Sequence, residues 1–572
     1  MRIRSLSALG MITAFAFFSV SLTPSLVPRP ATFLGLLGGL WASVGYGLGS
    51  AAQHWLTRSP DLGRPRRARQ RLLLWIERLR ELAPRPTGLV SALGITVIGV
   101  AYAVAYGALV VHWQNDVRAL VEMEPMENTG VLVFAGTTLL GVALGSVVGI
   151  SLSFVRRRIR RALERRGARS ARPASLVGTA LVAAVVLSII LFGGMRVVDG
   201  IYDNLNDQVP EGLLEPSTAL RSAGPGSPVS WDGLGRHGRA FIGGGPTAED
   251  IGEVTGVAAM DPVRVYVGVG NADTLAERAR IAVEELERTG GFERSVLVVA
   301  TPTGSGWLEA QAVDSLEYLH GGDTAIVSIQ YSFLPSWASF LFDAELPVDA
   351  SRALFDAVRS KWETLPPQQR PTLAVYGLSL GATGMQAALG SLDDIRDKTD
   401  AALFVGPPNS SQPWRDLQAA RDPGSPEWQP VLREGAEVRW LSKPGDFARL
   451  PGRWDQPRVA YLQHATDAVT WMDPRVIWQR PEWLSGPASE RGRGADVSDA
   501  MLWFPGVTYL HLVADMIMGV AVPAGHGHNF GDVIVDGWEG VLPRAGADQA
   551  SVSRIQTVIE SYSRDVEDPI WE

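Results

Sequence analysis

Cysteine is absent from this sequence of 572 residues, and only three of its residues are lysine. Without cysteine the chain can form no disulfide bond, no thiolate metal site and no cysteine nucleophile. Positive charge therefore comes almost entirely from arginine, and it is unevenly distributed. Residues 1–198 carry 23 arginines against 8 acidic residues, whereas the remainder carries 29 basic against 52 acidic residues. The acidic second part argues against a nucleic-acid partner, because neutralising phosphates requires a basic face.

Charged side chains are also missing from five long apolar runs in the first part of the chain. Each run reaches the roughly 20 residues that a helix needs to cross about 30 Å of hydrocarbon. The sequence therefore predicts an all-α bundle of about five transmembrane helices. These runs are Ser5–Pro28, Ala31–Thr57, Thr87–Asn115, Asn128–Val155 and Pro173–Met195. The first run could instead be a cleaved signal peptide, but its length and the lack of a small-x-small cleavage site favour a span.

Arginine between the runs predicts their orientation. Arg58–Arg85 and Arg156–Arg172 each hold nine arginines, and such segments stay in the cytoplasm. The chain is therefore expected to be a multi-pass plasma-membrane protein in contact with the bilayer, with a cytoplasmic N-terminus and everything after Asp199 outside. Glycines at four-residue spacing, such as Gly141 and Gly145, allow close helix packing and would permit self-association.

A different pattern begins after the membrane part. We predict a transmembrane domain over 1–198, a polar, Gly/Pro-rich linker over 199–232 and a catalytic domain over 233–572. In the last of these, short β-rich runs alternate with helical patterns, which predicts a mostly parallel sheet with helices on both faces. The expected strands are Val263–Val269, Ser295–Ala300, Thr324–Gln330, Thr372–Tyr376, Ala401–Val405, Val438–Leu441 and Arg458–Gln463.

The strongest motif in the chain is Gly377-Leu378-Ser379-Leu380-Gly381, which lies between a predicted strand and an Ala/Gly-rich helical segment. This is a GxSxG pattern in the context of a nucleophile elbow, where the glycines permit a tight strand-to-helix turn that projects the serine above the sheet. We therefore expect Ser379 to be a nucleophile. The Leu380 amide is the expected first oxyanion donor, and Gly304 or Ser305, in the Gly-rich loop after another strand, the second.

A serine nucleophile needs a histidine base and an orienting acid, which follow it in the order acid, then histidine. The Gly-rich loop Ala524–Asn529 carries His526 and His528, and either could be the base. His526 is preferred because it lies nearest the preceding apolar run. A His-x-His metal pair is the alternative interpretation, although no metal or cofactor is expected. Core positions are the more natural interpretation of the other two downstream histidines, His464 and His511.

The orienting acid is expected at Asp467, because it follows the end of the strand VAYLQ, where this fold places that carboxylate. Asp446, Asp473 and Asp515 are competing candidates in the same part of the chain.

Six motifs together carry a resemblance to a known family. They are RTGGFERS at 288–295, PTGSGW at 302–307, QYSFLPSW at 330–337, GLSLG at 377–381, GPPNSSQPW at 406–414 and PAGHGHNF at 523–530. With these motifs the chain resembles a bacterial, actinobacterial-type family that couples an N-terminal multi-span membrane domain to a C-terminal alpha/beta-hydrolase domain. The resemblance implies the alpha/beta-hydrolase fold and a lipase-like serine hydrolase activity, but no particular substrate.

The expected function is that of a membrane-anchored serine esterase with a Ser-His-Asp triad, acting on acyl or lipid esters outside the plasma membrane. An envelope acyltransferase would use the same residues, and the two activities differ only in the acceptor of the acyl group. A non-catalytic envelope scaffold is the third alternative. It would be expected to lack one member of the triad, whereas all three residue types are present here.

Overall fold

The computed structural model describes residues 7–58, 89–168, 170–450, 452–485, 492–544 and 548–562. The chain divides into two units. The first comprises Met1–Gly194 and Ser498–His511, and the second comprises Met195–Val497 and Leu512–Glu572. A division near residue 198 was expected, but the return of a late segment to the first unit was not.

The first unit is helical. Its helices are α1 (Ala8–Ser21), α2 (Ala31–Arg58), α4 (Leu89–Leu120), α5 (Asn128–Arg165) and α6 (Ala171–Asn206), the last of which continues into the second unit. Among the described residues, three helices are long and apolar enough to cross a membrane: Ala31–Leu56, Thr129–Arg165 and Ala171–Asn206. The predicted count of five was therefore too high.

The first predicted span fails for a local reason. Helix α1 ends at Ser21, and its 14 residues cover only about 21 Å at 1.5 Å per residue. Pro24, Pro28 and Pro30 follow, and proline cannot supply the backbone N–H that would continue the helix. The third predicted span begins at Thr87, outside the described residues. Most of the arginine-rich segment Arg58–Arg85 also lies outside them.

Glycines of α2 make close contacts with two neighbouring helices. A Cβ on Gly35 would lie 2.0 Å from the Thr137 Oγ1 of α5, and a Cβ on Gly49 would lie 2.0 Å from the Thr13 Oγ1 of α1. On α5, a Cβ on Gly141 would lie 2.5 Å from the Leu36 carbonyl oxygen. These small residues let the helix backbones approach closely, so they serve packing within the chain.

A seven-stranded, fully parallel sheet forms the centre of the second unit, in the order β1-β3-β2-β4-β5-β7-β6. Its strands are β1 (Val263–Val267), β2 (Val296–Thr301), β3 (Thr324–Ile329), β4 (Thr372–Leu378), β5 (Ala401–Val405), β6 (Val438–Leu441) and β7 (Arg458–Leu462). All seven predicted strands are confirmed. They read as continuous apolar runs because helices bury both faces of a parallel sheet.

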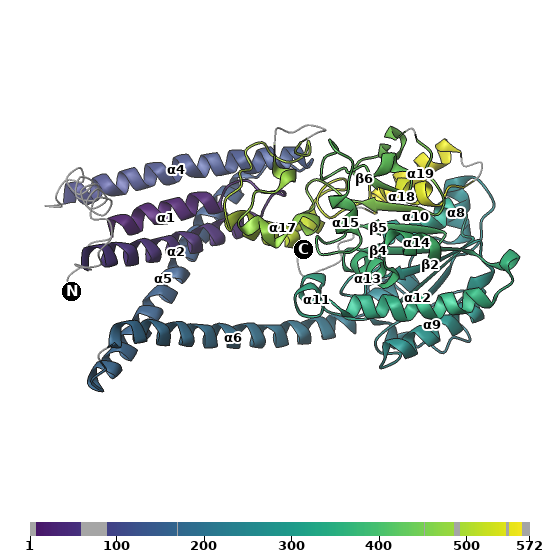
Figure 1. Ribbon diagram of the computed structural model, residues 1–572, viewed down its shortest axis with the longest axis horizontal. Helices are drawn as coiled ribbons and strands as arrows, with labels where there is room; N and C mark the ends of the chain where they lie inside the picture. Colours follow the sequence, from purple (N-terminus) through teal and green to yellow (C-terminus); the bar gives the residue numbers. More distant parts are fainter. Residues whose placement is uncertain are drawn as a thin grey trace. The chain divides into compact units, whose positions relative to one another are not determined.

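Helices cover the two faces of the sheet (Figure 1). One face packs against α9 (Leu275–Thr289), α12 (Leu346–Thr364) and α13 (Leu380–Leu389), and the other against α10 (Ala310–Leu319) and α18 (Ile534–Val541). Helix α19 (Gln549–Ser561) packs on α10 and α18. The shorter helices are α7 (Gly235–Gly243), α8 (Ala248–Thr255), α11 (Ser336–Phe342), α14 (Leu392–Lys398), α15 (Trp414–Ala419) and α16 (Ala468–Trp471). Helix α17 (Val507–Met518) begins in the first unit and ends in the second.

The segment predicted as a linker is attached to the sheet. Residues up to Asn206 continue α6, and Arg221 forms a parallel bridge with Arg264 of β1. The amide of Ser222 donates to the Arg264 carbonyl at 3.1 Å. The second unit therefore includes the end of α6 and much of residues 199–232.

Candidate active site

Ser379 occupies a strained turn between β4 and α13. Its backbone has φ 55° and ψ −119°, a conformation that a non-glycine residue keeps only when its surroundings enforce it. The flanking glycines show how tight the turn is. A Cβ on Gly377 would lie 2.4 Å from the Gly381 carbonyl carbon, and a Cβ on Gly381 would lie 2.2 Å from the Thr301 oxygen. The GxSxG pattern therefore follows from steric need, and Ser379 lines a pocket.

Asp467 and His528 form a buried hydrogen-bonded pair. Nδ1 of His528 lies 2.8 Å from Oδ2 of Asp467, whose side chain is fully buried. The same carboxylate accepts the Val469 amide at 2.9 Å and the Thr470 hydroxyl at 3.0 Å. These bonds fix the carboxylate, and an ionised carboxylate only accepts, so His528 carries its proton on Nδ1 and leaves Nε2 as an acceptor.

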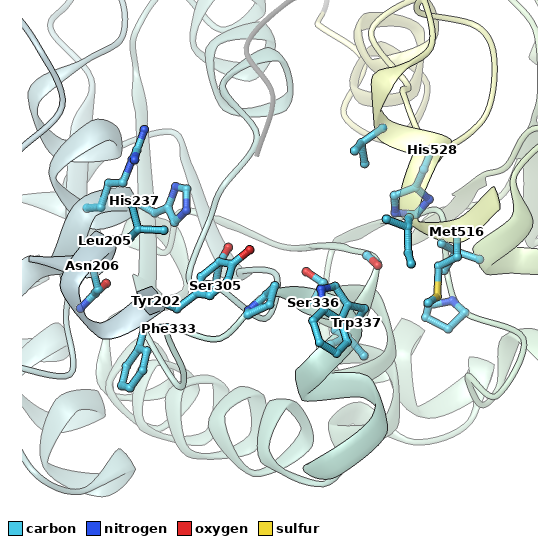
Figure 2. A pocket seen from close by; sticks show the side chains of 18 of the residues that line it. Tyr202, Leu205, Asn206, His237, Ser305, Phe333, Ser336, Trp337, Met516 and His528 are labelled. Carbon is cyan, nitrogen blue, oxygen red and sulfur yellow. The ribbon is translucent and has the colours of Figure 1, made fainter. Parts of the chain in front are cut away.

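The His528 imidazole lies beside the elbow. The Ser379 amide donates to the Val405 carbonyl at 2.9 Å, at the end of β5. A Cβ on the next residue, Gly406, would lie 2.4 Å from Cε1 of His528. Ser379 and His528 line the same pocket, and Figure 2 shows His528 at one end of it. The carboxyl ends of β4, β5 and β7 thus bring together a serine, a histidine and an aspartate.

His526 has a different partner. Its Nδ1 lies 3.0 Å from Oδ2 of Asp496. Burial favours the protonated carboxyl of Asp496, but this hydrogen bond, the nearby His526 and His464 charges and a backbone hydrogen bond together outweigh it, so the pKa of Asp496 lies below its ordinary value. Asp496 also accepts the Thr466 hydroxyl at 3.1 Å, and Thr466 in turn accepts the Gly527 amide at 2.9 Å. The structure thus places His526 against Asp496 and His528 against Asp467.

Glycine explains why two histidines separated by one residue face different carboxylates. Gly527 has φ 55° and Gly525 φ 92°, in the left-handed region that favours glycine, and they turn the chain sharply on either side of His526. Because the two imidazoles are engaged by separate carboxylates, they do not converge as a metal pair. Within the described residues, no group of three or more potential metal ligands occurs.

The two histidines predicted as core residues are both buried. The His464 ring stacks on Phe530 with centroids 4.4 Å apart, and its Nδ1 donates to the Gly527 carbonyl at 3.1 Å, so it supports the histidine loop. His511 lies in the first unit, where its Nε2 is 3.1 Å from the Ser21 carbonyl oxygen.

The competing acids have other hydrogen-bond partners. Asp446 accepts the amides of Ser442 and Lys443, and Asp473 pairs with Arg475. Asp515 is buried in α17. Among the four candidates, Asp467 is the one with a described bond to a histidine that lines the pocket with Ser379.

Two of the three expected oxyanion residues line the pocket with Ser379. Leu380 is the first residue of α13, so its amide has no acceptor within the helix, and it lines the pocket. Ser305 also lines the pocket, whereas the Gly304 amide donates to the Ser336 hydroxyl at 3.3 Å. Ser336 itself also lines the pocket.

The pocket wall is mainly apolar, with 12 of its 19 residues carrying hydrocarbon or aromatic side chains. It consists of Tyr202, Leu205, Asn206, Arg236, His237, Ser305, Phe333, Pro335, Ser336, Trp337, Ser379, Leu380, Pro408, Val469, Met472, Met516, Ile517, Val520 and His528. Burial, and to a lesser degree the neighbouring Arg236 cation, lowers the pKa of His237 to about 3, so His237 is neutral in the wall. Sequence reasoning missed the residues from α6 and α17, because nothing local marks them as part of a site.

Two family models match the chain. One, described as alpha/beta-hydrolase family, covers residues 263–555, and the other, described as alpha/beta-hydrolase family N-terminus, covers residues 22–246. No curated protein and no solved structure matches the chain. The first match includes Ser379, Asp467 and His528, and the second includes α2, α5 and α6.

Proposed function

The chain belongs to the alpha/beta-hydrolase family, and from this premise we propose that it is a serine esterase whose triad is Ser379, His528 and Asp467. One observation carries the proposal: a buried carboxylate holds the His528 imidazole at 2.8 Å in the pocket that Ser379 lines. A serine hydroxyl is a weak nucleophile and needs such an oriented base.

The reaction proceeds in two halves. The Ser379 hydroxyl attacks the ester carbonyl while Nε2 of His528 takes its proton, and the tetrahedral intermediate collapses when His528 returns that proton to the leaving alcohol. Water then attacks the acyl-enzyme, gives its proton to His528 and releases the acid as Ser379 regains its proton. Asp467 stays ionised throughout and stabilises the imidazolium that forms in each half.

Negative charge on the carbonyl oxygen needs preorganised donors. The Leu380 amide is the first, at the N-terminus of α13, where the helix dipole adds to its effect. We assign the second to the loop that carries Gly304 and Ser305. Ser305 lines the pocket directly, and the bond from Gly304 to Ser336 holds the loop in place.

Covalent labelling tests the nucleophile. A fluorophosphonate probe should label the full-length protein in detergent, because the activated serine attacks phosphorus and is trapped. Ser379→Ala should not label, whereas Ser411→Ala should label like the wild type. Ser411 is a buried serine after β5 whose hydroxyl bonds to Thr383, so its loss tests general disruption. Equal labelling of wild type and Ser379→Ala would refute the assignment.

We also propose that the catalytic unit lies outside the cytoplasm. Helix α5 ends in an arginine-rich segment, α6 follows it with an uncharged run over Pro173–Met195, and the catalytic unit begins at Met195. By the positive-inside rule, the arginines stay in the cytoplasm and α6 crosses to the other side. This argument uses only α5 and α6, so it does not depend on the number of earlier spans.

Reporter fusions test this orientation. A reporter that is active only outside the cytoplasm should be active when fused after Asp199 and silent when fused near Arg165. The reverse pattern would overturn the orientation and the external location of the substrate.

A further inference from the structure

The pocket wall includes the end of a candidate membrane span. Helix α6 carries an uncharged apolar run over Pro173–Met195 and continues unbroken to Asn206. Tyr202, Leu205 and Asn206, in its last two turns, line the pocket that contains Ser379. At 1.5 Å per residue, Tyr202 lies only about 10 Å along the helix axis from Met195. The residues of α6 that line the pocket therefore follow its apolar run within a few turns of the same helix.

The end of α6 is firmly held in the catalytic unit. Nη1 of the buried Arg239 donates to the Asp207 carbonyl at 2.8 Å and to the Gln208 carbonyl at 3.0 Å, just beyond the helix end. The Asn206 side-chain oxygen accepts from the Gln330 amide at 3.0 Å. These bonds hold the chain at the end of α6 and tie it to Gln330, the residue after β3. Its last turns are consequently a built part of the pocket wall.

A second apolar helix completes this wall. Met516 and Ile517 of α17 and the following Val520 line the pocket, and the first residues of α17 belong to the first unit. Methionine side chains are flexible and adapt to irregular apolar ligands. The two helices that supply these wall residues, α6 and α17, therefore both begin in the first unit.

His528 and the end of α6 line different parts of the pocket. Figure 2 shows His528 and Met516 on one side and Tyr202, Leu205, Asn206 and Phe333 on the opposite side, with Ser305, Ser336 and Trp337 between them. An ester whose carbonyl sits near His528 would thus extend past Trp337 and two serines toward Tyr202, Leu205 and Phe333 at the α6 end.

The part of the pocket lined by Tyr202, Leu205 and Phe333 is called the arm here. We propose that this arm binds the hydrocarbon chain of a long-chain acyl ester, and that the end of α6 sets the chain length accepted. The inference rests on the proposed esterase function and narrows its substrate class to lipid esters. Burying one CH2 group contributes about 0.8 kcal/mol, or roughly a fourfold gain in kcat/KM for each carbon that reaches the arm. Selectivity for long chains should therefore be steep until the arm is filled.

A chain-length series tests the inference. Full-length protein in detergent is assayed with p-nitrophenyl esters from acetate to palmitate, and kcat/KM is expected to rise at least about tenfold from acetate to the best chain. Leu205→Trp fills the α6 end of the arm, so it should lower the ratio of kcat/KM for the best long chain to kcat/KM for acetate by about tenfold or more. Ile517→Trp, on the facing helix, should shift the optimum in the same direction.

Leu214→Trp is the matched control, because Leu214 is an 80% exposed leucine that does not line the pocket, and its profile should equal that of the wild type. Fluorophosphonate labelling at the wild-type rate shows that each variant is folded. If labelled wild-type protein hydrolyses acetate as well as palmitate, or if Leu205→Trp lowers both equally, the inference is overturned while the triad stands. An enzyme that neither labels nor hydrolyses any ester would instead overturn the proposed function.

Discussion

His528→Ala is expected to lower kcat for ester hydrolysis by about 10⁴-fold or more, because removing the base of a serine triad leaves the hydroxyl unactivated. The protein should also lose fluorophosphonate labelling. The reason is geometric: His528 alone of the two loop histidines bonds to Asp467 and lines the pocket with Ser379. Steady-state kinetics with a soluble ester and the second-order labelling rate measure the two effects.

His526→Ala is the matched control, since it removes the same side chain two residues away on the same loop. It loses the bond to Asp496 at 3.0 Å, which supports the loop, but not the base. We expect about a tenth or more of the activity to remain, with an effect on stability larger than that on chemistry. If His526→Ala abolishes activity and His528→Ala preserves it, the base is His526, and if both variants stay active, the serine-histidine mechanism fails.

Arg264→Met is expected to lower the free energy of unfolding by about 3–5 kcal/mol, because it leaves two carboxylates buried without their cation. In the native protein the Arg264 guanidinium lies 2.6 Å from both Asp314 and Glu317, and the three side chains are at most 4% exposed. Arg264 also donates to the Phe241 carbonyl at 2.8 Å. Thermal or urea unfolding of the detergent-solubilised protein, followed by tryptophan fluorescence, measures the change.

The pH dependence of this loss has a definite sign. Burial raises the pKa of Glu317 to about 7 even though the Arg264 charge opposes it, and removing that charge raises it further. A carboxyl with a raised native pKa costs stability only once it ionises in the unfolded chain, at about pH 4. Below about pH 7 Glu317 is protonated in both native proteins, so its contribution to the destabilisation of Arg264→Met should be small there and grow as the pH rises above about 7.

Arg352→Met is the control for this prediction, because its ion pair with Asp349 is about half exposed on both sides. Such a surface pair contributes at most about 1 kcal/mol, so the variant should unfold nearly like the wild type at every pH. Equal losses of unfolding free energy in the two arginine variants would show that the buried cluster of Arg264, Asp314 and Glu317 does not stabilise the second unit.

Local patterns in the sequence determined the sheet and most of the site. The seven strands are runs that must be apolar because both sheet faces are buried, so they can be recognised without their neighbours. Likewise, GxSxG predicts the elbow because each glycine avoids a clash within the turn or with the strand beside it. Asp467 could be predicted because it lies in the loop after β7, five residues beyond the strand end, at the edge of the sheet where the carboxyl ends of the strands meet.

Only the tertiary structure determines which carboxylate each loop histidine contacts and which residues line the pocket. Two histidines separated by one glycine look alike in sequence, and what separates them is the position of Asp467 and Asp496, each at least 30 residues away along the chain. The same holds for Leu205. It lies near the end of α6, and the sequence places it in the predicted linker 199–232. It becomes a pocket residue because Arg239 and Gln330 hold that helix end against the catalytic unit. Local periodicity reports which face of an element is apolar, but the partner of that face is set by long-range packing.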